Sequence, residues 1–190
     1  MNRGQKMLVG IAVLFMAPLA LSFILYYGFG SIPFSPSGRL NHGELLQPVR
    51  PLTHVDLTLV DGSHPGGEFL RHRWTLLFVG EGNCDARCVQ ALHDTRQIRL
   101  LLNRDMGRVQ RLFLATGPCC DLAMLKREHP DLAVARAAPH DALLAQLPGK
   151  AGDLYIIDPL GNLVMRYGPA ASPKGLLEDL KHLLKLSQIG

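Results

Sequence analysis

The four cysteines of this chain are the residues whose type and spacing could do chemistry. Cys84 and Cys88 are separated by three residues in GNCDARCV, and Cys119 and Cys120 are adjacent in ATGPCCD. A thiolate is the nucleophile of disulfide exchange and also a ligand for soft metal ions. The Cys84/Cys88 spacing is therefore compatible with a structural disulfide, a redox pair or two metal ligands.

A purely structural disulfide is the weakest of these readings for Cys84 and Cys88. The loop that it would close is very short, and the entropic gain from a disulfide grows with the length of the closed loop. The spacing lets the two Cα atoms approach to disulfide distance. We therefore expect a redox or metal-binding role for the pair.

The residues around the pair predict a strand, a turn and then a helix. The apolar run RWTLLFVG over residues 73–80 predicts a buried central strand. From residue 84 to about residue 103 the apolar period becomes helical and places Cys88 on the buried face. The positive end of the helix dipole stabilises a thiolate, and we expect Arg87 to add to this effect.

Cys119 and Cys120 follow a second apolar run, RVQRLFLA over residues 108–115. In a parallel βαβ unit their loop lies at the same sheet edge as Cys84 and Cys88, where open α/β sheets place their chemistry. The four thiols could converge, with Cys119 and Cys120 as a resolving pair or as extra soft ligands. The alternative is a vicinal pair that caps the helix beginning near Asp121. Four cysteines allow three pairings, and the sequence does not choose among them.

The other elements complete an α/β order. Residues 54–62 alternate apolar and polar side chains and predict a short strand, while residues 153–158 and 163–168 predict a hairpin around PLGN. Helices are predicted over residues 121–129 and 140–147 and from Ser172, a candidate N-cap, to near the C-terminus. This order is that of a thioredoxin-like fold.

The N-terminus predicts a single membrane anchor. Residues 7–28 carry no charge and would span roughly 33 Å as a helix, enough for a bilayer core of about 30 Å. Arg3 and Lys6 precede the span, so the positive-inside rule places the short N-terminus in the cytoplasm. A signal peptide cleaved after Ala20–Ser22 is the alternative, but the apolar run is too long for a typical one. We expect a cytoplasmic stub and transmembrane anchor over residues 1–28, a linker over 29–52 and a thioredoxin-like domain over 53–190.

Charge and motifs exclude several functions. The formal net charge is +4, but the basic residues are scattered without a Lys/Arg block, which argues against nucleic-acid binding. The sequence has no P-loop, no GxGxxG and no Ser/His/Asp arrangement. Cysteines beyond the membrane lie in a compartment where disulfides persist, which in a bacterium is the periplasm.

The sequence resembles the Sco/SenC family of membrane-anchored, thioredoxin-like proteins that assist copper delivery to cytochrome c oxidase. The match rests on the anchor, on RWTLLFVGEGNCDARC, on DLYIIDPLGNLVMRY and on the Leu-rich terminal helix, and it covers roughly residues 50–188. In that family two cysteines and one distant histidine bind copper, and Cys84 and Cys88 correspond to the cysteines.

The histidine of the family has no counterpart here. The segment LPGKAGDLYIID has Lys150, Ala151 and Gly152 where the histidine is expected. Two thiolates can still bind Cu(I), whereas Cu(II) loses the imidazole ligand that suits it. Thiol–disulfide exchange needs only the two cysteines and is unaffected.

The resemblance implies a thiol–disulfide redox protein that assists cytochrome c oxidase assembly through Cys84, the attacking thiol, and Cys88, the resolving thiol. Whether this exchange is enzymatic stays open. One alternative is a Cu(I) chaperone that uses Cys84 and Cys88, with Cys119 or Cys120 as further ligands; copper is the one cofactor implied. Another is a non-catalytic anchored scaffold with structural disulfides. The expected partners are a cytochrome c oxidase subunit or its assembly factors, and the expected location is the bacterial inner membrane with the domain in the periplasm.

Overall fold

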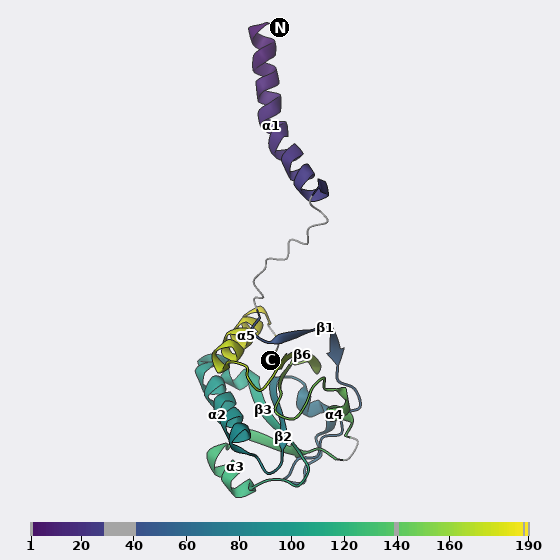
Figure 1. The fold of residues 1–190 in the computed structure, drawn as a ribbon, viewed down its shortest axis with the longest axis vertical. Coiled ribbons are helices and arrows are strands. Elements are labelled where there is room, and N and C mark those ends of the chain that lie inside the picture. The colour runs from purple at the N-terminus through teal and green to yellow at the C-terminus, as the bar shows by residue number, and fades with distance from the viewer. Residues whose placement is uncertain (1, 29–40, 139–140, 188, 190) are drawn as a thin grey trace. The chain divides into compact units, whose positions relative to one another are not determined.

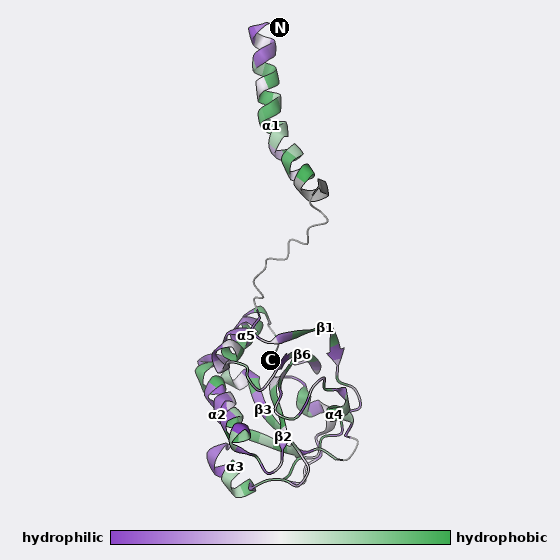
Figure 2. Ribbon diagram, in the orientation of Figure 1, coloured by the Kyte–Doolittle hydropathy of each residue, from purple (hydrophilic) through white to green (hydrophobic). Residues whose placement is uncertain are grey.

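The computed structural model describes residues 2–28, 41–138, 141–187 and 189, and it divides the chain into two compact units, Met1–Leu40 and Asn41–Gly190. The first unit contains helix α1, Arg3–Gly28, with Pro18 inside it (Figure 1). Its segment Arg3–Ile24 contains an 18-residue window with a mean hydropathy of 2.5 and is long and apolar enough to cross a membrane. Apolar residues predominate along this helix (Figure 2).

The second unit is built on one six-stranded sheet of order β1-β6-β5-β2-β3-β4. The strands are β1 Glu44–Pro51, β2 Trp74–Glu81, β3 Val109–Thr116, β4 Leu132–Arg136, β5 Leu154–Ile157 and β6 Asn162–Tyr167. Strands β2, β3 and β4 are parallel, whereas β5, β6 and β1 pair antiparallel. The sheet therefore joins one parallel half to one antiparallel half, with β2 between them.

Side chains that alternate along the central strands form two apolar cores, one on each face of the sheet. Phe78 belongs to the core beneath helices α2 (Ala86–Leu101), α3 (Leu122–Glu128) and α5 (Pro173–Leu186). Its neighbour Leu77 belongs to the opposite core, which α4 (Ala142–Gln146) and the 3₁₀ turn η1 (Gly66–Leu70) cover. A second 3₁₀ turn, η2 (Asn103–Arg108), connects α2 to β3.

Several predicted elements are confirmed. The predicted central strands coincide with β2 and β3, and the predicted hairpin with β5 and β6. Helix α2 buries Cys88, Leu92, Thr95 and Ile98, the face that the helical period indicated. Ser172 is the N-cap of α5 and is followed by Pro173 at its first position.

Two predictions about the start of the domain are wrong. Residues 54–62 form no strand and make only an isolated bridge between Leu59 and Ala135. Strand β1 instead lies at residues 44–51, inside the predicted linker of residues 29–52, and residues 29–40 of that linker lie outside the described residues. The cause is that β1 is an edge strand with one buried residue, Leu46, and with Pro48 and Pro51, which edge strands tolerate. It therefore has no alternating pattern to recognise.

Candidate redox site

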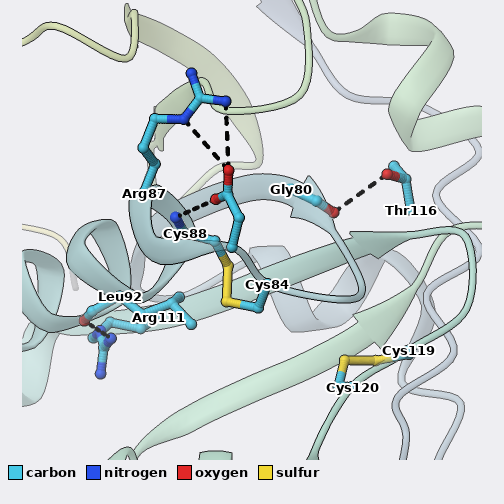
Figure 3. Close-up of a disulfide and its surroundings, with 10 residues drawn as sticks. Gly80, Cys84, Arg87, Cys88, Leu92, Arg111, Thr116, Cys119 and Cys120 are labelled. Atoms are coloured by element: carbon cyan, nitrogen blue, oxygen red, sulfur yellow. Dashed lines mark hydrogen bonds and ion pairs between the residues drawn. A yellow bond between two sulfur atoms is a disulfide. The ribbon is translucent and has the colours of Figure 1, made fainter.

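Cys84 and Cys88 form a disulfide where β2 gives way to α2, with their Cα atoms 5.0 Å apart (Figure 3). Cys84 lies in the turn after Glu81, and Cys88 lies in the first turn of α2. Cys84 is half-buried and Cys88 is 3% exposed. An incoming thiolate therefore reaches Cys84 more readily than Cys88.

Backbone contacts to the next strand hold the turn that carries Cys84. The Gly82 N–H donates to the Thr116 carbonyl at 2.9 Å, and the Cys84 N–H donates to the Glu81 carbonyl at 3.0 Å. A side chain at Gly82 would collide with the backbone, because its Cβ would lie 2.0 Å from the Pro118 carbonyl oxygen. Only glycine lets the loops after β2 and β3 approach this closely.

Asp85 caps α2 and changes the electrostatics that the sequence suggested. Its carboxylate accepts the Cys88 backbone N–H at 2.9 Å, and this bond, together with Arg87, holds the pKa of the Asp85 carboxyl below its usual value. Arg87 pairs with Asp85 at 3.4 Å. The expected help from Arg87 to a thiolate is therefore offset, because a negative charge already occupies the helix N-terminus.

A buried guanidinium holds α2 against the sheet one turn beyond Cys88. Arg111 on β3 is 1% exposed and donates to the Leu92 carbonyl, to Thr95 Oγ1 at 3.0 and 3.2 Å and to Asp131 at 3.2 Å. Burial lowers the pKa of Arg111, and the Asp131 carboxylate opposes that effect. Because Leu92 follows Cys88 by four residues, these bonds fix the part of α2 that sets the position of Cys88.

The sequence interpretation missed the contribution of Arg111 and Asp131. One signal was present, since Arg111 is a charged residue within the apolar run that forms β3. A charge at such a position is rarely buried unless it is paired. Its partner, Asp131, lies in a turn between α3 and β4, where nothing in the sequence marked it.

A cavity of about 190 Å³ lies beside Cys88 and is lined by Phe78, Gly80, Glu81, Asp85, Arg87, Ala91, Ala151, Gly152 and Pro169. The segment that lacks the expected histidine thus faces the cysteine pair. The backbone of this segment is fixed to β2, because the Gly152 N–H donates to the Val79 carbonyl at 2.7 Å and the Val79 N–H donates to the Asp153 backbone carbonyl at 3.1 Å. A second cavity of about 170 Å³ shares Arg87, Gly152 and Pro169 with the first and extends between α2 and α5.

Asp153 is the residue that ties this segment down. Its carboxylate is 2% exposed, pairs with Arg166 Nε at 2.9 Å and accepts the Lys150 backbone N–H at 3.0 Å. Gly149 lies so close that a Cβ there would be 2.1 Å from the Asp153 carboxylate. The wall of the cavity opposite Cys88 is therefore a rigid loop with small side chains, Ala151 and Gly152.

Cys119 and Cys120 form a separate vicinal disulfide in the loop after β3 (Figure 3). Cys120 has a φ of 114°, in the region that glycine prefers. No disulfide joins this pair to Cys84 or Cys88 in the part of the chain that the structure describes. Within those same residues, no three His, Cys, Asp or Glu side chains group so as to hold a metal ion. The sequence left open whether the four thiols converge or whether Cys119 and Cys120 form a vicinal pair, and the structure has the vicinal pair.

Comparison with solved structures identifies the fold. The apo Sco1 protein from Thermus thermophilus has a TM-score of 0.60 and 22% identity, covering 75% of this chain and 96% of that chain. The copper-bound ScoI of Arabidopsis thaliana has a TM-score of 0.59 and 17% identity, covering 76% and 99%. Copper-bound yeast Sco1 has a TM-score of 0.60 and 17% identity, covering 73% and 90%.

The resemblance to Sco/SenC proteins that the sequence predicted is thus confirmed in the fold. No curated protein matches the sequence. The family model described as transmembrane-like, thioredoxin-like, C-terminal domain matches residues 74–187, which is more than half of the chain and contains both cysteine pairs. The chain therefore belongs to this family of thioredoxin-like domains, and it has the fold of the Sco proteins.

Proposed function

We propose that the protein is a membrane-anchored thiol–disulfide exchange protein of the Sco type, acting through Cys84 and Cys88. The observation that carries the proposal is the Cys84–Cys88 disulfide at the start of α2, beside a cavity whose opposite wall offers Ala151 and Gly152 instead of a histidine ligand. Two thiols without a third ligand are sufficient for exchange and insufficient for the copper site of the family. The partner is a cytochrome c oxidase subunit or one of its assembly factors.

The exchange proceeds through a mixed disulfide at Cys84. A partner thiolate attacks the Cys84 sulfur, the Cys84–Cys88 bond breaks and Cys88 leaves as a thiolate. The second thiolate of the partner then attacks the first partner sulfur, which is bonded to Cys84 in the mixed disulfide. This step closes the partner disulfide and releases Cys84 as a thiolate. Two electrons and two protons pass from the partner dithiol to Cys84 and Cys88, and the reverse sequence reduces a partner disulfide.

The anchor places this reaction at a membrane. We propose that α1 spans the bacterial inner membrane once, with Arg3 and Lys6 in the cytoplasm and the second unit in the periplasm. The charges before α1 support this orientation, and the periplasm allows the disulfide to persist. Fusion of a periplasm-dependent reporter to the C-terminus tests the orientation, and an active cytoplasm-dependent reporter at that end would contradict it.

Trapping the mixed disulfide tests the exchange. In the full-length chain, Cys88→Ser removes the resolving thiol, so the Cys84 thiolate should attack a partner disulfide and accumulate with it as a covalent mixed-disulfide complex on non-reducing gels. Cys84→Ser is the matched control and should capture far less, because Cys88 is buried. Equal capture by the two variants would refute the assigned roles. A disulfide that resists mild reductants, together with normal oxidase assembly in the Cys84→Ser/Cys88→Ser variant, would favour the scaffold hypothesis instead.

Delivery of Cu(I) is the second candidate, and the copper-bound Sco neighbours support it. After reduction, Cys84 and Cys88 could hold Cu(I) as cargo between two thiolates. Anaerobic metal analysis of the reduced full-length chain decides: one Cu(I) per chain that disappears in Cys84→Ser supports delivery, and no bound copper rules it out. Ala151→His adds an imidazole at the cavity wall without changing a positive-φ glycine, and should create Cu(II) binding if this wall holds the position of the missing ligand.

A further inference from the structure

The second disulfide, Cys119–Cys120, lies in the loop that packs directly on the loop of the proposed redox pair. A Cβ added at Gly82 would lie 2.8 Å from the Cys119 Cα, and the Gly82 N–H donates to the Thr116 carbonyl. Cys84 follows Gly82 by two residues, so the Cα atoms of Cys84 and Cys119 lie within about 12 Å of one another. A disulfide needs Cα atoms about 4.4–6.8 Å apart. The two loops would therefore need to close by no more than about 5 Å to join the two residues.

The side chains of both pairs also face the same layer of the protein. Cys88 belongs to the apolar core under α2, and Cys84, Cys119 and Cys120 pack against that same core. Cys84, Cys119 and Cys120 are half-buried, whereas Cys88 is buried. Gly117 begins the Cys119 loop with a φ of 74°, and a Cβ added there would meet no other atom within 4 Å. A glycine at this position gives the start of the loop more backbone freedom than any other residue would.

The backbone at Cys120 indicates the direction of electron flow. Its φ of 114° lies outside the left-handed region, φ about +50 to +70°, that residues other than glycine adopt, whereas the φ of 40° at Cys84 lies close to that region. The disulfide to Cys119 is a covalent constraint on this backbone, and breaking it removes that constraint. A disulfide whose reduction relieves strain is the better electron acceptor.

We propose that Cys119–Cys120 is a second redox couple that takes electrons from the Cys84/Cys88 dithiol, an inference that rests on the proposed function. The Cys84 thiolate attacks the Cys119 sulfur, the Cys119–Cys120 bond breaks and Cys120 leaves as a thiolate. The Cys88 thiolate then attacks Cys84, which restores the Cys84–Cys88 disulfide and releases Cys119. The result is a Cys119/Cys120 dithiol, with two electrons and two protons transferred.

This relay makes the chain a four-electron acceptor. A protein dithiol supplies the first two electrons at Cys84–Cys88, and the transfer to Cys119–Cys120 regenerates the disulfide that meets the next dithiol. An external disulfide, such as oxidised glutathione, would return the Cys119/Cys120 dithiol to its starting state. No further cofactor is needed for the electrons to balance.

The direction is tested on the oxidised full-length chain in detergent. One equivalent of dithiothreitol is added without oxygen, the reaction is quenched with acid, and free thiols are alkylated and located by peptide mass spectrometry. Label at Cys119 and Cys120 should exceed label at Cys84 and Cys88 by about tenfold or more, the ratio for a difference of about 30 mV between two-electron couples. Label confined to Cys84 and Cys88 would overturn the proposal.

The path is tested with paired trap variants. Cys88→Ser/Cys120→Ser leaves Cys84 and Cys119, which should form an intramolecular disulfide when oxidised glutathione is added as the electron acceptor. The control Cys84→Ser/Cys120→Ser leaves Cys119 and the buried Cys88, which should not form one under the same treatment. A natively folded trap variant that stays fully reduced would overturn the relay. The variant Cys119→Ser/Cys120→Ser keeps only the Cys84–Cys88 disulfide. That disulfide should still be reduced, and the variant should take up two electrons per chain instead of four. If Cys84–Cys88 cannot be reduced there, the proposed function fails rather than the relay alone.

Discussion

Replacing Arg111 with methionine is the sharpest test of how the fold positions the redox pair. Arg111→Met keeps much of the volume of the side chain but removes its bonds to Leu92, Thr95 and Asp131. Removing one partner of a buried ion pair generally costs 3–5 kcal/mol. We expect a cost at the lower end of this range for Arg111→Met, because the Asp131 side chain is 24% exposed and keeps a second ion-pair partner, Arg99, at 3.5 Å.

The expected loss is therefore about 3 kcal/mol in the free energy of unfolding of the second unit, or about 6–12 °C in Tm. Trp74 is the single tryptophan of the chain and is 5% exposed, so its fluorescence reports unfolding in urea. Arg127→Met is the matched control, because its ion pair with Glu128 is exposed and should leave Tm nearly unchanged.

The same variant tests the link to function. If Arg111 holds α2 in place, loosening it should change the rate at which Cys84–Cys88 exchanges with a small dithiol, in a chain that is still folded. Thr95→Val removes the two bonds from Arg111 to Thr95 Oγ1, so the two substitutions combined should cost less than the sum of the single losses. A loss of less than about 1 kcal/mol in Arg111→Met, or strict additivity with Thr95→Val, would refute the anchoring argument.

Three further predictions follow from the same geometry. Gly82→Ala should destabilise the second unit by about 2 kcal/mol in urea unfolding, because the added Cβ would collide with the backbone of the Cys119 loop. The control Gly107→Ala should have little effect, because a Cβ added there meets no atom within 4 Å. Equal effects of the two substitutions would contradict the close approach of the loops. Asp85→Asn removes a negative charge beside Cys88 and should lower the pKa of the reduced thiols, measured from the pH dependence of alkylation; an unchanged pKa would contradict the electrostatic argument. Burial, reinforced by nearby arginine charges, lowers the pKa of His129. The unfolded chain therefore binds more protons than the folded chain, and the free energy of unfolding should fall as the pH drops below about 6.5. His129→Leu should flatten this pH dependence, and an unaltered slope in that variant would refute the assignment.

The sequence by itself determined the elements with strong periodic patterns and the chemistry placed between them. The apolar runs before Cys84 and Cys119 predicted β2 and β3, and the helical period after Cys84 predicted the buried face of α2, because burial on such elements leaves a direct trace in residue type. The same reasoning placed Cys84 and Cys88 at a strand–helix junction and detected that Lys150, Ala151 and Gly152 replace the expected histidine.

Only the tertiary structure decided which distant groups meet. Strand β1 is defined by its pairing with β6 rather than by its own sequence, and β4, which the pattern missed, is five residues long and pairs with β3. The bond between Arg111 and Asp131, the charge of Asp85 that offsets Arg87, and the contact of Gly82 with the Cys119 loop are likewise long-range or geometric facts. The first and third depend on the distance between chain segments after folding, which residue order does not encode locally, and the second depends on the rotamers of two neighbouring side chains at the start of α2.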